Sequence, residues 1–435
     1  MIGIVVSRAD SASEHIGEHL LELADWKERA ADVYRTDGFE MRAFDEWHLE
    51  LDRVADAFDD PDCIVFASRH SGDSGQLLSA HFTGNFGEAE YGGSSEDLAT
   101  PCPGMHKRVL RGLETNAPDG WDVAMECTHH GPTDVGAPAM FVELGSDEEA
   151  WRDAAGARAV ARSILDLGEY QSGTADRDPG KTVVGIGGNH YAPRPTRLVL
   201  ETDVAVGHVA ADWSIDAMGD PESNHELIDR LFEASDTTLA VFDGEYPAVA
   251  SVVKSLGYRI VSERWLRETQ GRPVSLVVAV ESALSPIDDG LRFGERTADP
   301  EEVAYRRLPE ELIAACEAVD ADRTTDVVAT NTVAYETVEN GNKIEGSAAF
   351  ARRDDYDELV DGLVPILEEE YEVVEREVDG VTVERTAFDP EAARAAGVPE
   401  GPRFGELAAG SPVEVDGDRI EPDQVRSRER RRFDV

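Results

Sequence analysis

Met1-Ile2-Gly3-Ile4-Val5-Val6-Ser7 opens the chain with a short apolar run. It has no basic leader and no small-residue cleavage site, so a buried first strand explains it better than a signal peptide. Further short apolar runs follow at Cys63–Ala67, Val123–Cys127, Met140–Leu144, Val183–Ile186 and Leu239–Phe242. We expect all of them to form buried strands.

Amphipathic stretches separate these runs. Apolar residues recur near helical spacing in Ala12–Leu23, Glu149–Leu167 and Asn224–Ala234. This alternation predicts an α/β domain built on a largely parallel sheet with helices on both faces. Val274–Val280 is expected to be its last strand.

Turn-forming residues between Ser285 and Pro300 predict a domain boundary. We expect a first domain over residues 1–285 and a smaller acidic α+β module over residues 300–435. The module is predicted to contain helices Pro300–Val319 and Asp354–Glu370 and strands near Val327–Val333 and Val381–Thr386. All 11 histidines lie at or before His225, so imidazole chemistry belongs to the first domain.

The composition describes a strongly acidic protein. The net charge is −49 and is spread along the whole chain, and lysine is scarce. Such a surface is typical of organisms that keep molar salt in the cell, where the Debye length falls to about 3 Å and screens self-repulsion. No stretch approaches the roughly 18 apolar residues of a membrane span. We therefore expect a salt-adapted cytoplasmic protein with no membrane partner. The 4 cysteines form no CxxC pair, which argues against a disulfide framework and a zinc ribbon.

Three glycine-rich loops carry most of the chemically unusual residues. They are Ser68-Arg69-His70-Ser71-Gly72 with Ala80-His81-Phe82-Thr83-Gly84-Asn85-Phe86-Gly87, then Glu126-Cys127-Thr128-His129-His130-Gly131-Pro132-Thr133-Asp134, then Gly185-Ile186-Gly187-Gly188-Asn189-His190-Tyr191-Ala192-Pro193-Arg194. We expect each to follow a buried strand, and ligands of open α/β sheets bind at the carboxyl ends of strands.

The second loop makes the strongest case for a site. Glu126, His129 and His130 place several ionisable groups at one turn, and imidazoles suit both acid–base work and zinc ligation near neutral pH. The alternative is that the paired histidines cap a strand and bind loop backbone.

The other histidines allow more than one interpretation. His190 follows Gly187-Gly188, whose amides could bind an oxyanion or phosphate, but the spacing does not match a dinucleotide fingerprint and a plain turn is equally compatible. His70 and His81 could be site residues or ordinary loop histidines. His106, beside Lys107, could line a site, although a solvated basic helix fits it better.

Taken together, these loops resemble the archaeal and plant type of D-aminoacyl-tRNA deacylase. The motifs occur in the expected order, and the resemblance covers roughly residues 1 to 280. It implies a zinc-dependent enzyme that hydrolyses the ester joining a D-amino acid to tRNA and releases both, a proofreading step for mischarged tRNA. It also implies a fold similar to peptidyl-tRNA hydrolase and the phosphorylases. The partner would be tRNA carrying a D-amino acid, and the protein would act as a monomer.

On this hypothesis His129, His130, His190 and Glu126 form the catalytic group. The first three are candidate zinc ligands or proton carriers, and Glu126 is a candidate base or ligand-orienting partner. Substrate binding is assigned to loop residues that accompany them: His70, His81, Thr83, Asn85, Thr128, Gly187, Gly188 and Tyr191. Two alternatives remain open, namely a metal-free esterase assisted by a hydroxyl of the tRNA and a nucleotide- or RNA-binding module without catalysis.

The C-terminal extension carries two weaker signals for tRNA. The stretch from Phe388-Asp389-Pro390 to Arg403-Phe404-Gly405 resembles a segment of the tRNA 3′-processing nucleases. A basic cluster near the C-terminus would suit RNA binding or form a frayed tail; it consists of Arg426, Arg428, Arg430, Arg431 and Arg432.

Overall fold

The computed structural model describes residues 1–168, 180–377, 379–415 and 417–435. It divides into two compact units, Met1–Gly271 and Arg272–Val435. The turn-rich stretch around residues 285–300, where the sequence predicts a boundary, therefore lies inside the second unit. Among the described helices, none combines the length and apolar character that crossing a bilayer requires.

The first unit is organised by a large mixed sheet. In spatial order its strands are β2 (Lys27–Ala30), β3 (Val33–Thr36), β4 (Phe39–Phe44), β1 (Ile2–Ser7), β5 (Cys63–Arg69), β10 (Ala139–Leu144), β6 (Leu77–His81) and β9 (Asp122–Met125). Strands β4, β1, β5 and β10 run parallel, whereas β6 is antiparallel to β10. All six residues of β1 are buried, which confirms the first predicted strand.

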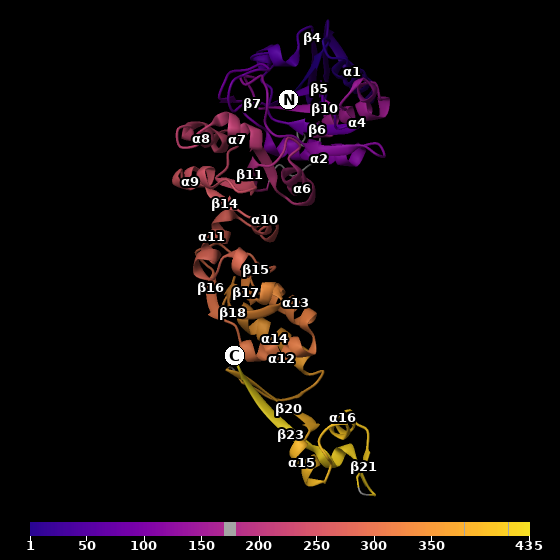
Figure 1. Ribbon diagram of the computed structural model, residues 1–435, viewed down its shortest axis with the longest axis vertical. Coiled ribbons are helices and arrows are strands. Elements are labelled where there is room, and N and C mark those ends of the chain that lie inside the picture. The colour runs from indigo at the N-terminus through magenta and orange to yellow at the C-terminus, as the bar shows by residue number, and fades with distance from the viewer. Residues whose placement is uncertain (169–179, 378, 416) are drawn as a thin grey trace. The chain divides into compact units, whose positions relative to one another are not determined.

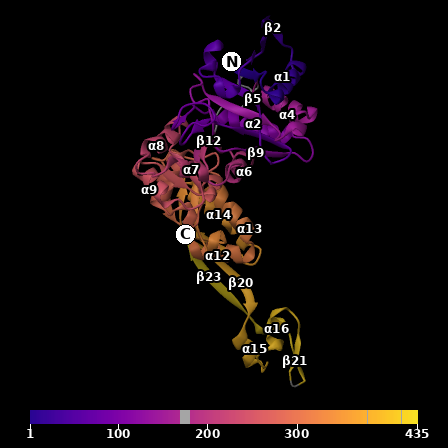
Figure 2. The same cartoon turned by 45° about the horizontal axis from the view of Figure 1, so that its top comes forward.

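Helices cover one face of this sheet. They are α1 (Ser11–Leu23), α2 (Pro103–Asn116) and α4 (Ala154–Leu165), and α4 lies against both α1 and α2 (Figures 1 and 2). The opposite face packs against loops that contribute Leu51, Val54 and Val135 to a core around Phe66 and Phe141. The sequence predicts helices on both faces of the sheet, and this prediction is wrong for the large sheet, which has helices on one face and loops on the other.

A second, smaller sheet completes the first unit. Its strands are β12 (Ala205–Ala210), β11 (Thr182–Gly187), β13 (Leu239–Asp243) and β14 (Arg259–Val261), all parallel. The helices that accompany it are α6 (Pro193–Glu201), α7 (Asp212–Met218), α8 (His225–Ala234), α9 (Pro247–Ser255) and α10 (Glu263–Glu268). The expectation of a single sheet is wrong, because the chain leaves the first sheet after β10 and its next four strands, β11 to β14, pair only with one another among the described strands. Two shorter strands, β7 (Gly84–Asn85) and β8 (Asp97–Leu98), pair with each other.

Two predicted elements of the first 285 residues need correction. Val274–Val280 is not a strand but part of α11 (Val274–Ala283). A short apolar run fits either structure, and here Leu276, Val277 and Val280 are buried while Val278 is 41% exposed, which is helical spacing. The predicted helix Glu149–Leu167 is split into α3 (Glu148–Trp151) and α4, because the Asp153 side chain accepts the Gly156 N–H and caps a new helix.

The second unit contains an antiparallel sheet packed against helices. The strand order is β15 (Leu291–Phe293), β17 (Ala334–Val338), β18 (Lys343–Phe350) and β16 (Ala304–Arg307), and the helices are α12 (Glu310–Val319), α13 (Ala321–Asn331) and α14 (Asp355–Leu367). The predicted helix Pro300–Val319 is thus shorter at its start. The predicted strand Val327–Val333 is wrong for most of its length, because residues up to Asn331 belong to α13. The Asp320 side chain accepts the Arg323 N–H and caps the start of this helix.

The rest of the second unit is a strand ribbon with a small lobe. Strands β19 (Glu372–Glu377), β20 (Gly380–Phe388) and β23 (Arg426–Asp434) are antiparallel neighbours, and β20 contains the predicted strand Val381–Thr386. The lobe holds α15 (Pro390–Ala395), α16 (Pro402–Ala408), β21 (Val413–Val415) and β22 (Asp418–Ile420) (Figures 1 and 2). Short 3-10 turns lie at His48–Glu50, Val54–Ala57, Ile287–Asp289, Glu339–Gly341 and Pro422–Val425.

The C-terminal arginines belong to β23 and do not form a frayed tail. Arg428 lies 3.3 Å from Glu384, and Arg430 lies 3.4 Å from Glu375. Arg432 pairs with Glu377 at 2.6 Å. Carboxylates therefore balance the positive charge of this cluster, which weakens the case for it as an RNA-binding surface.

His106 is buried in α2, which contradicts its assignment to a solvated helix. It is fully buried, stacks 4.7 Å from the Phe82 ring, and finds no hydrogen-bond partner among the described residues. Burial lowers the pKa of His106 to about 4. The imidazole is therefore neutral in the folded protein and costs free energy to protonate.

Replacing His106 by leucine is expected to flatten the pH dependence of stability. The pKa rises from about 4 in the fold to 6.5 in the unfolded chain, so the unfolded chain takes up the proton first as the pH falls. As the pH falls from about 6.5 to about 4, His106 therefore lowers the free energy of unfolding of the wild type by on the order of 3 kcal/mol. Leucine cannot take up a proton, so the free energy of unfolding of H106L should rise relative to that of the wild type as the pH falls. Denaturant unfolding in molar KCl measures both, and parallel curves would contradict the assignment.

Candidate active site

Neighbouring strands of the large sheet carry His70, His81 and Glu143. β5 ends just before His70, β6 ends at His81, and Glu143 lies within β10. His81 pairs with Phe141, and side chains two residues apart on a strand share a face, so His81 and Glu143 project from the same face of the sheet. This face is the one that loops cover, since Phe141 belongs to the core beneath them.

The segment after β9 ties the two sheets together. The Glu126 N–H donates to the carbonyl of Ala80 on the first sheet at 3.1 Å. The next residue, Cys127, donates its N–H to the His190 carbonyl at 2.8 Å, and the Thr128 N–H donates to Val209 of β12 at 2.9 Å. These bonds bring the loop after β11, with His190, alongside Glu126.

His129 and His130 turn back toward the end of β6. Thr83 forms an isolated parallel bridge with His129, and the Gly84 N–H donates to the His130 carbonyl at 2.8 Å. His130 has a positive φ of 41°, an uncommon conformation for a residue with a side chain. The tight turn places both imidazoles against His81.

Glu126 is a fully buried carboxylate among histidines. Its Oε2 lies 2.7 Å from His190 Nε2 and 3.8 Å from His129 Nε2, and its Oε1 lies 3.0 Å from His70 Nδ1. Burial alone would raise the pKa of Glu126, but hydrogen bonds from His190 and His70 outweigh it and hold the pKa well below its usual range. Glu126 is therefore ionised and orients the two imidazoles.

His70 is a protonated imidazole held between two carboxylates. Its Nδ1 faces Glu126 and also lies 3.4 Å from Glu143 Oε2, and its Nε2 lies 3.2 Å from the Tyr191 hydroxyl. Burial opposes its charge, but the two glutamates outweigh burial and raise the pKa of His70 to about 11. His70 thus supplies a fixed positive charge and is not available as a base.

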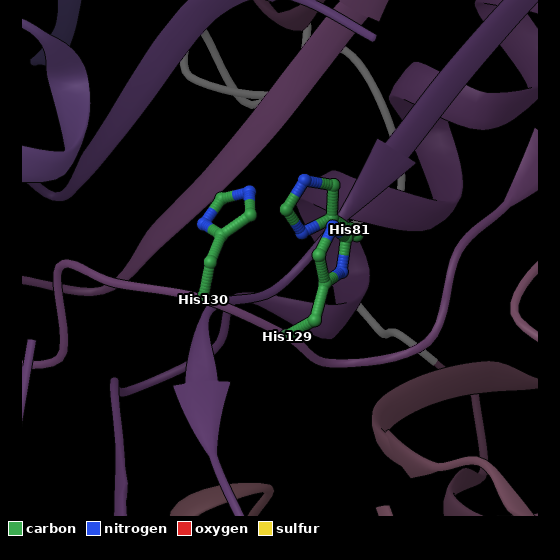
Figure 3. Close-up of side chains that lie close together, drawn as sticks. All are labelled: His81, His129 and His130. Carbon is green, nitrogen blue, oxygen red and sulfur yellow. The ribbon is translucent and has the colours of Figure 1, made fainter. Parts of the chain in front are cut away.

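His81, His129 and His130 form a cluster of imidazoles (Figure 3). The ring centroid of His81 lies 4.2 Å from that of His129 and 4.9 Å from that of His130, and the latter two are 4.3 Å apart. In each ring Nδ1 faces a backbone carbonyl, that of Phe82, Cys127 or Gly131, at 2.7 to 3.1 Å. If Nδ1 carries the proton and donates, Nε2 is left as the free lone pair, the usual tautomer of a metal-binding histidine.

Burial keeps two of these imidazoles neutral. Burial and the neighbouring His81 lower the pKa of His130 to about 4 and that of His129 well below its usual range. In His81 the effect of burial is outweighed by Glu143, which raises the pKa; its Nε2 lies 3.6 Å from Glu143 Oε1.

Donor atoms gather in four overlapping groups in the described part of the chain. The groups are His81–His129–His130, Cys127–His129–His190, His70–Glu126–His190 and His81–Glu126–Glu143, each with its ligand atoms within 4.8 Å of one another. His129, His130 and His190, the predicted zinc ligands, do not form one group. His129 instead belongs to two groups, one with His130 and one with His190.

A cavity of about 950 Å³ opens beside these residues in the first unit. His70, His129, His130, His190 and Glu143 line it. Apolar and aromatic side chains form much of the remaining wall, including Trp47, Leu49, Tyr91, Phe141 and Trp213. The cavity therefore joins ionisable groups to a surface that can hold an organic substrate.

Comparison with known proteins decides the family. The model of the D-aminoacyl-tRNA deacylase family matches residues 57–261, which include every donor residue of the site. A D-aminoacyl-tRNA deacylase of Halorubrum lacusprofundi is 48% identical over all of this chain and 97% of its own length. The chain belongs to the D-aminoacyl-tRNA deacylase family. The enzyme is accordingly an ester hydrolase.

Other relatives also span the enzyme. The deacylase of Natronomonas pharaonis is 48% identical over the full length of both chains, and that of Methanococcoides burtonii is 31% identical over 98% of this chain and 95% of its own. A crystal structure of a conserved protein of unknown function is 28% identical, with a TM-score of 0.56 over 62% of this chain and 98% of that one. The haloarchaeal relatives agree with the salt adaptation that the acidic composition predicts.

The predicted substrate-binding residues of the deacylase fall into two sets. His70 and Asn85 line the cavity. The others are not among its lining residues: His81, Thr83, Thr128, Gly187, Gly188 and Tyr191. Thr128, for example, is buried with its hydroxyl 3.0 Å from His208 Nδ1, and Thr83 donates to the Pro132 carbonyl at 2.7 Å.

Sequence reasoning missed Glu143 and Cys127 as site residues of the deacylase. Glu143 contacts both His70 and His81, and Cys127 Sγ lies 3.6 Å from His190 Nδ1. A signal for Glu143 existed, because a carboxylate inside the apolar run Met140–Leu144 must be paired when buried. For Cys127 the signal was its position between Glu126 and the histidine pair.

Replacing Glu126 by glutamine should weaken both the fold and the deacylase activity. The change leaves protonated His70 with one carboxylate, and breaking a buried pair costs on the order of 3 kcal/mol. Glu40→Gln is the matched control, because Glu40 is equally buried and pairs with Arg35 and Arg42 away from the cavity. E40Q should lower stability alone, whereas E126Q should also slow single-turnover deacylation. An E126Q enzyme as stable and as active as wild type would show that the Glu126 carboxylate is not needed to orient His70 and His190.

Proposed function

We propose that this site hydrolyses the ester between a D-amino acid and the 3′ end of tRNA by attack of water assisted by zinc. The observation that supports it most is the meeting of imidazoles and a buried carboxylate at one wall of an organic-sized cavity, where the same imidazoles share donor groups with the Cys127 thiol. The reaction proofreads mischarged tRNA and would take place in the cytoplasm.

The donor chemistry fits zinc. Zinc prefers nitrogen and sulfur ligands, and catalytic sites commonly use three protein ligands and keep one position open. His81, His129 and His130 form one of the donor groups, and each Nδ1 faces a backbone carbonyl, which leaves the Nε2 atoms for a metal. The buried Nε2 of His81 has no hydrogen-bond partner in the described chain, and Glu143 Oε1 lies 3.6 Å from it. We assign these three residues to the metal, with Cys127–His129–His190 as the alternative set.

Zinc bound there would polarise the ester carbonyl or lower the pKa of a bound water to about 7. His190 supplies the proton transfer. Its Nε2–H donates to Glu126, which fixes the ring and leaves Nδ1 as the acceptor, and a third of its side chain is exposed to the cavity. It takes the proton of the attacking water and returns it to the leaving ribose oxygen. His70 adds a fixed positive charge where negative charge develops on the carbonyl oxygen.

A metal-free route is the second candidate. A ribose hydroxyl of the tRNA could activate water itself while protein groups hold the ester. The gathering of three imidazoles favours the metal, because the neutral His129 and His130 are buried beside His81 and a cation between the rings would use their lone pairs.

The two units would divide the work. We assign hydrolysis to the first unit, which holds every histidine, and propose that the acidic α+β extension contributes to tRNA binding or to stability. The enzyme is proposed to act as a monomer.

Variants of His129 and His190 should separate metal binding from proton transfer. His129→Asn should lose bound zinc and at least about 10²-fold in rate, whereas His190→Asn should keep zinc and lose a similar factor. His225→Asn, on α8 and outside the cavity, is the control and should change neither. Metal content by elemental analysis and single-turnover deacylation, with and without chelator, measure both. Near-wild-type rates in H129N, or a wild type indifferent to chelator, would favour the metal-free route.

A chain ending at Gly271 should fold and retain deacylase activity in molar KCl. The first unit keeps both of its sheets, the cavity and all donor residues within Met1–Gly271. Its KM for D-aminoacyl-tRNA should rise if the extension binds RNA. Circular dichroism and steady-state kinetics measure the outcome, and an insoluble or inactive fragment would assign the extension to the fold of the first unit.

A further inference from the structure

Arg69 at the cavity is held in an unusual way. It follows the last buried residues of β5, and its guanidinium lies 4.5 Å from the Trp47 ring and 4.7 Å from the Trp151 ring. The Trp151 indole N–H donates to the His70 carbonyl at 2.8 Å, and Asp10 accepts the Arg69 backbone N–H at 2.9 Å. Stacked on two indoles and anchored through its backbone, the guanidinium is fixed in place.

The N–H donors at the edge of this guanidinium form no ion pair among the described residues. Among the described residues no carboxylate oxygen lies within 4.0 Å of it, whereas the charged His70 and Glu143 of the same cavity pair with each other. Arg69 is also the single lysine or arginine among the described residues that line the cavity. A guanidinium with its faces covered offers in-plane N–H donors in a fork that matches a phosphate or carboxylate.

Two aromatic side chains at the same cavity are exposed. Tyr91 is 66% exposed and Trp213 is 46% exposed, and both line it. Exposed aromatic rings beside a pocket are costly to solubility unless they bind something, and unpaired nucleobases stack on such rings whatever their sequence.

We propose that the cavity mouth binds the unpaired 3′ end of the tRNA, with Arg69 contacting a phosphodiester and Tyr91 and Trp213 stacking on the terminal bases. The proposal rests on the proposed function, because it names how the tRNA part of that substrate is held. It places the ester linkage inside the cavity, next to the imidazole cluster.

The charge around the mouth limits where the RNA backbone can lie. Glu50, Glu88 and Glu90 also line the cavity and are exposed, so they repel phosphates. Two positive charges line the cavity, and that of His70 is already held between two glutamates, so Arg69 is the one we assign to a phosphodiester. In molar salt the Debye length is about 3 Å, so long-range attraction is screened and a direct bidentate contact has to supply the affinity.

Calorimetric titration with two small probes tests the assignment without depending on catalysis. Adenosine contains a base and no phosphate, whereas the trinucleotide CpCpA contains both. In molar KCl, Arg69→Gln should raise the Kd for CpCpA about tenfold or more and leave the Kd for adenosine unchanged. Tyr91→Ala and Trp213→Ala should each weaken both probes by about fivefold or more.

Matched variants guard against indirect effects. Arg158→Gln removes the same charge from α4, where Arg158 pairs with Glu22 at 3.6 Å, and should leave both Kd values unchanged. Arg69→Lys keeps the positive charge without the fork and should fall between wild type and R69Q, and melting temperatures establish that each variant is folded. The proposal is overturned if wild type binds neither probe, if R69Q weakens adenosine as much as CpCpA, or if the aromatic variants bind as wild type does. A deacylase activity that chelator does not reduce would instead contradict the proposed zinc-assisted function, and the Kd values for adenosine and CpCpA would still test the present proposal.

Discussion

The site depends on one buried carboxylate, that of Glu126. It lies in the segment between β9 and β10 that bridges the two sheets, with its backbone bonded to β6 and the next two residues bonded to the loop after β11 and to β12. An ionised group in this position is tolerable only because His70 and His190 pair with it. The same pairing that offsets burial therefore brings imidazoles from two different sheets into one cavity wall.

Glu143, on β10, is a second buried carboxylate of the site. Because it contacts His70 and His81, it connects the Glu126 group to the His81–His129–His130 cluster. The result is a division among chemically identical side chains. His70 is held as a cation by two glutamates, while His129 and His130 are kept neutral by burial, so one imidazole carries a charge and the other two keep a free lone pair.

The acidic composition and the tRNA substrate seem opposed, but they act on different scales. In molar salt the repulsion between a polyanionic substrate and a chain of net charge −49 is screened, so on the proposed function binding would depend on short-range contacts. The C-terminal arginines do not provide them, since cross-strand glutamates pair with these arginines along β23. Aromatic surfaces and single well-placed cations suit such an enzyme better than a broad basic patch.

The sequence by itself determined the apolar strands β1, β5 and β10, the salt-adapted surface, the family and the loops that carry the histidines, because these depend on local pattern and residue type. Only the tertiary structure decided that the strands form two sheets, that Val274–Val280 is helical, and that Glu143 and Cys127 join the site. Strand pairing and side-chain proximity arise between residues far apart in the chain. Local periodicity does not determine which of these distant segments pair. His106 shows the same limit, since its basic neighbours suggested solvent and packing of α2 on the sheet buried it.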